Sequence, residues 1–189
     1  MPKLQKRNLD PSNVELEINL DEIFDQKVDF TEEQVTAIGQ TVIDIIDERT
    51  RSGKDMWGKA FAKYSNSYIN SDEFSIYKDS KKPDLVLRDE MLNSMTIKKA
   101  TSNKVIIGFD GEENSAKAHA HITNHNGDWK ITPRDFFGIN ASDVTSLKKE
   151  FADFIDTSMP ESSSEPTKKV SDLMDQLSTL SALKERFFG

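Results

Sequence analysis

The chain has 189 residues, of which 35% are hydrophobic and 31% charged, and its formal net charge at pH 7 is -8. It contains no cysteine, which excludes disulfides, thiolate catalysis and cysteine-ligated zinc. The acidic balance argues against specific nucleic-acid binding through a basic surface. No apolar run approaches the roughly 18 residues of a membrane span, and none follows the charged N-terminus. We therefore expect no membrane segment and no signal peptide, in a protein that is soluble and intracellular when made.

Residues 1–30 are expected to form an N-terminal arm with one strand. The turn-forming residues Asp10 to Asn13 precede a segment in which apolar and polar residues alternate. This two-residue period is typical of a half-buried strand. The apolar positions are Val14, Leu16, Ile18 and Leu20.

A long helix is predicted from about Thr31 to Ser52, at the start of an α+β core domain that spans residues 31–156. Thr31 and Gln34 have the spacing of a capping box, in which each side chain bonds a backbone amide of the other residue. Apolar residues then recur at helical spacing, and Gly53 follows the predicted end. They are Val35, Ile38, Val42, Ile45 and Ile46.

The rest of the core is predicted to contain a hairpin and several further elements. Residues 53–83 contain several aromatic residues but no clear hydrophobic periodicity. Residues 85–91 are expected to form a short helix. Residues 94–99 and 104–109 predict two strands joined by a turn. Residues 116–124 predict another helix or an irregular strand, and residues 129–139 an edge strand. Ser142 is expected to cap a helix that runs to about Asp156.

The end of the chain predicts a linker followed by an amphipathic helix. Residues 157–167 are rich in Ser and Pro and have little to bury. Residues 168–189 carry apolar side chains at three- and four-residue steps, among them Leu173, Leu177 and Leu180. The expected fold is α+β: an antiparallel sheet flanked by the long helix and a second helix, with the C-terminal amphipathic helix on a tether.

The three histidines of the chain lie within seven residues, as His119, His121 and His125. Imidazole nitrogens bind zinc, nickel or copper, so a metal-dependent hydrolase is one functional alternative. No His-Glu-x-x-His motif accompanies them, so the signal for a metal site is weak, and an exposed polar loop between two structural elements is the favoured explanation. We therefore assign no metal site, no cofactor and no catalytic residue, although paired carboxylates are plentiful in the sequence.

Residues 131–139 contain a proline, an arginine and two adjacent phenylalanines. Pro133 fixes the backbone at the entry, and Arg134 can bind carboxylates or backbone carbonyls. Phe136 and Phe137 would point to opposite sides of an extended segment. One ring would then face inward and the other outward, and exposed apolar area often marks an interface.

Three segments resemble the phage Mu-like virion morphogenesis family, the small tail-completion or neck proteins of tailed phages. Residues 131–139 are similar to its Pro-x-Arg-Pro-Phe-Leu-Gly-Leu signature, with Asp135 in place of the second Pro. Residues 85–95 are similar to its Leu-x-x-Thr-Gly-x-Leu-x-x-Ser-Ile stretch, with Asp89 in place of Gly. Residues 124–127 are similar to its His-x-x-Gly, with Asn124 in place of His. The resemblance covers about residues 31–155.

The resemblance implies a structural protein without enzymatic activity that forms a ring at the neck or tail terminus and joins head to tail. Its partners would be other copies of itself and neighbouring neck, connector or tail-tube proteins. It would be located in the virion, and in the host cytoplasm before assembly. We expect Arg134, Phe136 and Phe137 to shape one interface, and Leu173, Leu177 and Leu180 to form a second docking surface. A monomeric adaptor that presents its C-terminal helix is a further alternative.

Overall fold

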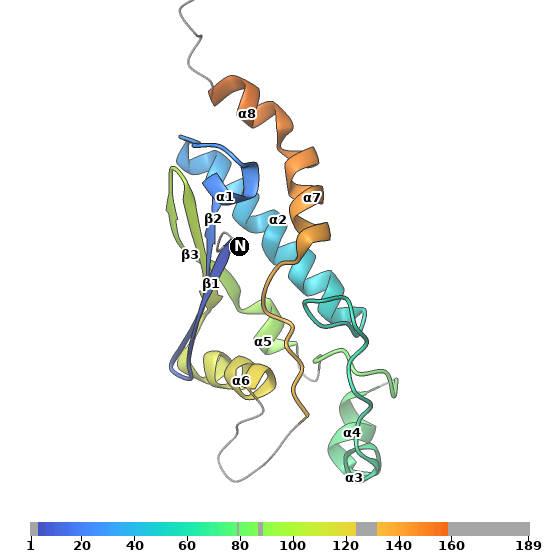
Figure 1. Ribbon diagram of the computed structural model, residues 1–189. Coiled ribbons are helices and arrows are strands. Elements are labelled where there is room, and N and C mark those ends of the chain that lie inside the picture. Colours follow the sequence, from blue (N-terminus) through green and yellow to red (C-terminus); the bar gives the residue numbers. More distant parts are fainter. Residues whose placement is uncertain (1–3, 79, 87–88, 124–131, 159–189) are drawn as a thin grey trace, which may run out of the picture. The chain divides into compact units, whose positions relative to one another are not determined.

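A four-stranded antiparallel sheet forms one layer of the fold, with its strands in the order β1-β2-β4-β3 (Figure 1). The computed structural model describes residues 4–78, 80–86, 89–123 and 132–158, which all belong to the first of two units, Met1–Ser158. The strands are β1 (Gln5–Asp10), β2 (Asn13–Asn19), β3 (Met95–Thr101) and β4 (Lys104–Phe109). The helices are α1 (Leu20–Phe24), α2 (Glu32–Arg51), α3 (Asn66–Ile69), α4 (Asp72–Tyr77), α5 (Glu90–Asn93), α6 (Glu112–Thr123), α7 (Ala141–Glu150) and α8 (Ala152–Ser158). The expected α+β class with an antiparallel sheet is confirmed.

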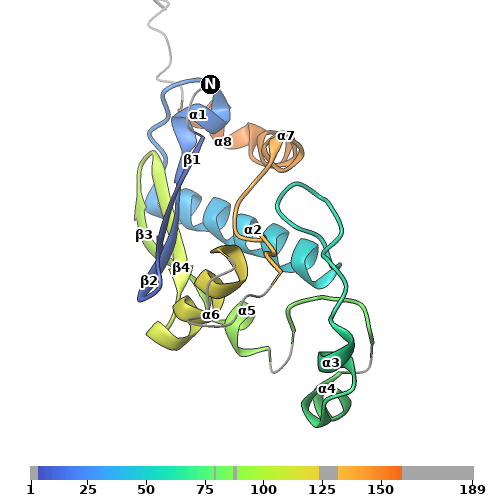
Figure 2. The ribbon, with the colours of Figure 1, turned by 60° about the horizontal axis from the view of Figure 1, so that its bottom comes forward.

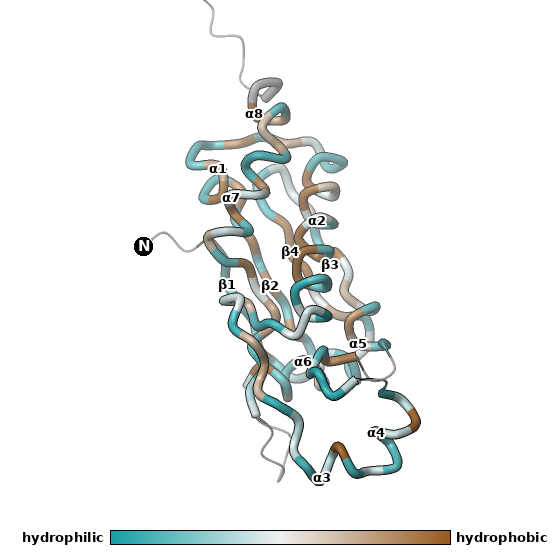
Figure 3. The backbone as a smooth tube through the Cα atoms, turned by 90° about the vertical axis from the view of Figure 1, so that its right-hand side faces the viewer, coloured by the Kyte–Doolittle hydropathy of each residue, from teal (hydrophilic) through white to brown (hydrophobic). Residues whose placement is uncertain are grey.

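The two faces of the sheet differ in polarity because side chains alternate along each strand. Val14, Leu16 and Ile18 of β2 are fully buried on the face that the helices cover, together with Val105 and Ile107 of β4. The opposite face is polar: Glu17 of β2 forms an ion pair with Lys104 of β4 at 3.1 Å. Figures 1 and 2 show α2 and α7 on the same side of the sheet, and hydrophobic segments follow β2, β4 and α2 in Figure 3.

Helix α2 begins as predicted and packs closely on the sheet. The Thr31 hydroxyl accepts from the Gln34 amide at 3.2 Å, and the Gln34 side chain accepts from the Thr31 amide at 2.9 Å, which completes the capping box. Gly39 permits the close approach: a Cβ atom there would lie 2.8 Å from Ile97 Cδ1 and 2.9 Å from Val105 Cγ2. The apolar face of the helix, including Ile38 and Ile46, is buried against the sheet.

One buried cation joins the end of α2 to the segment that leads into α7. The Arg49 guanidinium donates to Asp143 at 2.5 Å, to the Phe136 carbonyl at 3.1 Å and to the Gly138 carbonyl. Asp143 also accepts from the Asn140 amide at 2.9 Å, and the Asn140 side chain caps α7 in return. Burial lowers the pKa of Arg49, and the nearby Asp143 charge opposes that shift. Arg49 therefore fixes both an irregular segment and the start of a helix.

The N-terminal residues contribute two strands, where one was predicted. Strand β1 escaped prediction because its helix-facing positions include Gln5 and Arg7, which are polar. Both side chains bind the segment before α7. Gln5 bonds both backbone groups of Ile139, at 2.9 and 3.0 Å, and Arg7 forms an ion pair with Asp135. Strand β2 agrees with the predicted alternation, and it lies inside the sheet between β1 and β4.

The elements around the hairpin also differ from expectation at their boundaries. The expected helix over residues 85–91 is wrong, because Leu85 and Asp89 have φ values of 57° and 64° and α5 begins only at Glu90. Strands β3 and β4 confirm the predicted hairpin, with a register shift between Ile97 and Lys99. Of the two alternatives for residues 116–124, the helix is correct as far as Thr123, the last described residue of this segment, and α6 starts earlier, at Glu112.

The predicted edge strand and the predicted cap of the following helix are wrong. Residues 132–139 belong to no strand, and their backbone is held by irregular bonds such as Arg134 N–H to the His121 carbonyl at 2.7 Å. Residues 129–131 lie outside the described residues. Asn140, rather than Ser142, caps α7, because its side chain accepts from the amides of Ser142 and Asp143. The helix ends at Glu150 and α8 follows, so a single helix to Asp156 is not formed.

The predicted linker and C-terminal helix lie largely beyond the described part of the chain. Helix α8 extends to Ser158 and so includes the first two residues of the expected linker. Residues 159–189, with the whole C-terminal amphipathic segment, are outside the described residues. Among the described helices, none has the length and apolar character needed to cross a bilayer.

Replacing Arg49 tests this junction. Arg49→Leu leaves the part-buried Asp143 carboxylate without its cation and removes two bonds to backbone carbonyls, so we expect the free energy of unfolding to fall by about 1.5–3 kcal/mol. Arg51→Leu is the matched control: Arg51 pairs with Asp47 and Asp89 at half-exposed positions, and its loss should cost about 1 kcal/mol or less. Chemical denaturation of the three proteins measures both values. Equal losses in the two variants would contradict the assigned role of Arg49.

Candidate interaction surface

The exposed large hydrophobic side chains of the described residues all lie between α2 and α5. Trp57 is 68% exposed, Ile76 is 69% exposed and Tyr77 is 43% exposed. We call residues 53–78 and 80–86 the aromatic lobe. Figures 1 and 2 both show its helices α3 and α4 apart from the strands. Because exposed apolar area of this kind often marks a contact with another molecule, the aromatic lobe is the candidate site.

Trp57 is presented by a hydrogen-bonded turn. The Asp55 carboxylate accepts from the backbone amides of Trp57 and Lys59, at 2.9 and 2.8 Å. Gly58 supplies the turn with a φ of 80°, a conformation that side chains other than glycine disfavour. The preceding residue, Met56, is only 1% exposed. Its amide donates to the Asp135 carbonyl at 2.7 Å, and its carbonyl accepts from the Asn140 side chain at 2.8 Å. Trp57 is therefore held outward beside a buried anchor.

A broad groove of about 740 Å³ runs beside Trp57. Its walls come from the C-terminal half of α2, the Trp57 turn and the first turn of α7, including Ile45, Ser52 and Ala141. The Arg49–Asp143 pair lies in the same wall. The ion pair that organises the fold thus also forms part of the surface next to the exposed tryptophan.

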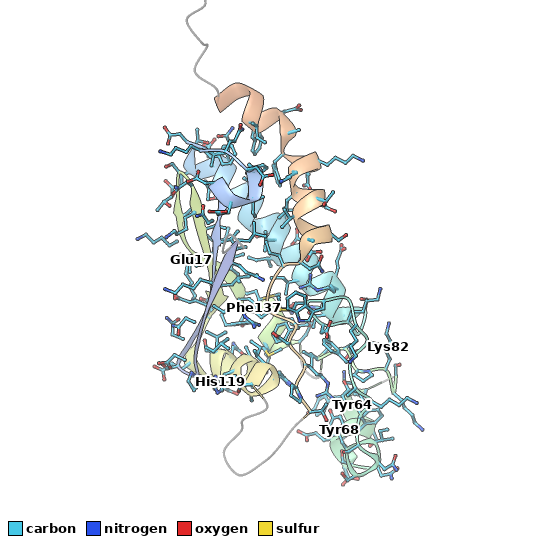
Figure 4. All side chains as sticks on the ribbon, in the orientation of Figure 1. Glu17, Tyr64, Tyr68, Lys82, His119 and Phe137 are labelled. Carbon is cyan, nitrogen blue, oxygen red and sulfur yellow. The ribbon has the colours of Figure 1, made fainter. Side chains whose placement is uncertain are left out.

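The second half of the aromatic lobe has a small core of its own. The rings of Tyr64, Tyr68 and Phe74 meet edge to face, with centroid distances of 5.1, 5.8 and 5.4 Å (Figure 4 labels the two tyrosines). Such pairs contribute about 0.5–1.5 kcal/mol beyond their buried area. Lys78 forms an ion pair with Asp84 and lies 5.6 Å from the centre of the Tyr64 ring. This core fixes α4, on which Ile76 and Tyr77 are exposed.

Arg134 joins the aromatic lobe to the rest of the fold. It is 8% exposed, and its guanidinium lies 5.4 Å from the Tyr64 ring centre and donates to the Ala62 carbonyl at 3.4 Å. Its Nε has no hydrogen-bond partner among the described residues. Burial lowers the pKa of Arg134, while its proximity to Tyr64 and Tyr68 acts in the opposite direction. The Arg134 guanidinium therefore binds a backbone carbonyl and an aromatic ring of the same chain.

The two predicted interface phenylalanines are both internal. We expected one ring of Phe136 and Phe137 to face outward, and this is wrong, because both side chains are fully buried. They pack with Phe109 of β4 at centroid distances of 6.3 and 4.8 Å (Figure 4 labels Phe137). The outward orientation required an extended strand, which this segment does not form. Neither ring offers contact area to a partner in this arrangement. The other predicted docking residues, Leu173, Leu177 and Leu180, lie outside the described residues.

Helix α6 separates the histidines that were considered as a metal site. Residues two positions apart on a helix point about 200° away from each other. His119 Nδ1 lies 2.7 Å from the Leu9 carbonyl of β1, whereas the ring of His121 lies on the side of Arg134. His125 is outside the described residues. Within the described part of the chain, no three His, Asp or Glu side chains come together in a way that could hold a metal ion.

Sequence reasoning missed Trp57, Ile76 and Tyr77 as exposed residues. The signal for Trp57 was present in Asp55-Met56-Trp57-Gly58, where an Asp side chain can bond the backbone two residues later and glycine permits a positive φ. No comparable local pattern marks Ile76 or Tyr77. Comparisons with protein-family models, curated proteins and solved structures found no match to this chain.

The pH dependence of stability tests the burial of His121. Burial lowers the pKa of His121 from 6.5 to about 4, with a smaller contribution from the charge of Arg134. Between these two pH values the unfolded chain binds a proton that the folded chain does not. Stability should therefore fall as the pH falls from 6.5 to 4, by up to about 3 kcal/mol from this group.

His121→Gln should remove this component. Denaturant unfolding at pH 7 and pH 4.5 should show a smaller loss for the variant than for the parent chain. The carboxylates that titrate in the same range are common to both proteins and cancel in the comparison. Parallel stability curves for the two proteins would contradict the burial of a neutral imidazole.

Proposed function

We propose that this protein is a non-enzymatic structural component of a phage particle, which forms a ring at the neck or tail terminus and joins head to tail. The motif resemblance in residues 85–95 and 131–139 supports the assignment to this class. The proposed mode of action, contact with other proteins, rests on where the exposed apolar side chains lie. Within the described residues, Trp57, Ile76 and Tyr77 all belong to the aromatic lobe. Such a surface suits contact with another protein.

A closed ring is built from heterologous contacts, in which one patch of a subunit meets a different patch of the next. We assign the aromatic lobe as one of these patches. Its two exposed parts rest on fixed supports, the Met56 anchor and the Tyr64–Tyr68–Phe74 core. A surface ordered before binding loses less conformational entropy on association. The lobe is thus suited to recognition between preformed subunits.

The energy available from these side chains favours assembly over stable pairs in dilute solution. Burial of a fully exposed large apolar side chain contributes roughly 1.5–3 kcal/mol. Because Trp57, Ile76 and Tyr77 are 43–69% exposed, the three together contribute less than roughly 9 kcal/mol. Association costs an estimated ~4–15 kcal/mol in lost translational and rotational freedom. A single contact of this size is marginal. Copies would accumulate where a growing particle presents several contacts together, as proposed for a neck or tail-terminus ring.

The proposed partners are other copies of this chain and neighbouring neck, connector or tail-tube proteins. The proposed location is the virion, after assembly from the host cytoplasm. A net charge of -8 would let a ring surround passing DNA without holding it, because like charges repel. The proposal includes no cofactor, membrane or specific nucleic-acid site.

A paired substitution tests the aromatic lobe. Trp57→Ser with Ile76→Ser removes two exposed apolar side chains without disturbing a buried one, so folding should be retained. Loss of about 1.4 kcal/mol of contact energy weakens one contact about tenfold, and in complementation of a phage that lacks this gene we expect the yield of infectious particles to fall clearly below that of the control. Lys6→Ser with Lys99→Ser, at exposed positions of the outer strands, is the control and should leave the yield unchanged.

Two results would count against the proposal in different ways. Equal yields from the lobe variant and the control would remove the lobe as a contact surface. Normal joining of heads and tails without the gene, together with absence of the chain from purified particles, would remove the phage role itself. Thermal unfolding of each variant verifies that folding is unchanged.

A further inference from the structure

The groove beside Trp57 has apolar side chains in its walls and no net charge. Ile45 and Ala141 contribute apolar surface together with Trp57, which is 68% exposed. Two basic and two acidic residues complete the charge of the lining, so it attracts neither an anion nor a cation as such. They are Arg49, Lys54, Glu48 and Asp143. The groove therefore suits an occupant whose contact face is apolar.

The sequence supplies an occupant of this kind in residues 168–189, which lie outside the described residues. Apolar side chains recur there at three- and four-residue steps, a pattern that predicts an amphipathic helix. Such a helix binds a groove through anchors spaced in this way. The anchor positions are Val170, Leu173, Leu177, Leu180 and Phe187.

Charge favours the same segment for contact between two copies of the chain. Residues 168–189 contain four basic and three acidic side chains, a net charge of +1, whereas the whole chain has a net charge of -8. The rest of the chain therefore has a net charge of -9. Two copies of an acidic protein repel each other, and this repulsion is reduced where one copy contributes its least acidic part.

The path of the chain favours the groove of a neighbouring copy. Helices α7 and α8 lead from Ala141, in the groove wall, to Ser158, and Figure 1 shows α8 continuing away from the start of α7. The distance along these two helices is roughly 25 Å. Residues 159–167 reach about 30 Å at most when fully extended. A return to the groove of the same copy along both helices would use most of this reach, and contact with an adjacent copy avoids the return.

We propose that residues 168–189 of one copy bind in the Trp57 groove of a neighbouring copy. The apolar positions of the segment would cover the Trp57 ring, and its charged positions would stay in solvent. This inference rests on the proposed function, because it supplies the second patch that a heterologous ring contact requires.

Fluorescence of Trp57 tests the contact in the full chain. Trp129→Phe leaves Trp57 as the one tryptophan, and the protein is kept at a concentration at which light scattering shows monomers. A synthetic peptide of residues 168–189 is the probe. We expect a saturable shift of Trp57 emission to shorter wavelength. A control peptide with Leu173→Ser, Leu177→Ser and Leu180→Ser should cause no shift.

A pair of matched variants locates the binding site. Ala141→Glu places a carboxylate in the groove wall, and Ala152→Glu places one at the start of α8, outside the lining. Both alanines are exposed and begin a helix, where an acidic side chain is favourable, so both variants should fold. We expect Ala141→Glu to weaken peptide binding about tenfold or more, because the bound segment would bury an unpaired charge. Ala152→Glu should bind like the parent chain.

Three results would overturn the proposal. They are absence of a saturable shift up to about 1 mM peptide, equal affinity of Ala141→Glu and the parent, and binding of the segment within its own copy. The last would appear as a Trp57 that is shielded from acrylamide in the monomeric full chain and becomes accessible when the three leucines of that chain are replaced by serine.

The peptide experiment involves no phage particle, so it separates this inference from the proposed function. Peptide binding would stand even if the chain were absent from particles. Failure of the peptide to bind, together with a lower particle yield for the Trp57→Ser, Ile76→Ser variant, would remove this inference alone.

Discussion

The Arg49 guanidinium joins three parts of the chain that are far apart in sequence: the end of α2, the backbone at Phe136 and Gly138, and the start of α7. Its effects extend further through Asn140, which shares Asp143 with Arg49 and also donates to the Met56 carbonyl. Met56 precedes the exposed Trp57. Loss of Arg49 would leave the part-buried Asp143 carboxylate without its charge-assisted bond. The position of the candidate contact surface therefore depends on the ion pair in the wall of the neighbouring groove.

Patterns that local physics controls could be predicted from the sequence. The alternation from Val14 to Ile18 identified a strand, and Thr31 with Gln34 located the start of α2, because each signal acts within a few residues. Strand β1 was missed because Gln5 and Arg7 face the helices while bonding a segment more than 100 residues away. The orientations of Phe136 and Phe137 were also beyond local reasoning, since they depend on Phe109 and on Arg49. The exposed residues of α4 carry no local signal, so that half of the candidate site required the structure.

Helix α4 has side chains in three different surroundings. Phe74 packs against Tyr64 and Tyr68, Glu73 lines a cleft beside α5 and α6, and Ile76 and Tyr77 are exposed. The same short helix thus presents charge on one side and apolar area on another. Arg134 supports the arrangement through the Tyr64 ring.

In the proposed function, the aromatic lobe becomes buried when the chain joins the assembled particle. The environment of Trp57 reports this directly in a chain whose other tryptophan, Trp129, is replaced by phenylalanine. Fluorescence and acrylamide quenching would be compared between the isolated chain and purified particles that contain it. Burial of Trp57 predicts emission at shorter wavelength and reduced quenching in the particles. Emission and quenching that remain those of the isolated, exposed tryptophan would contradict the claim.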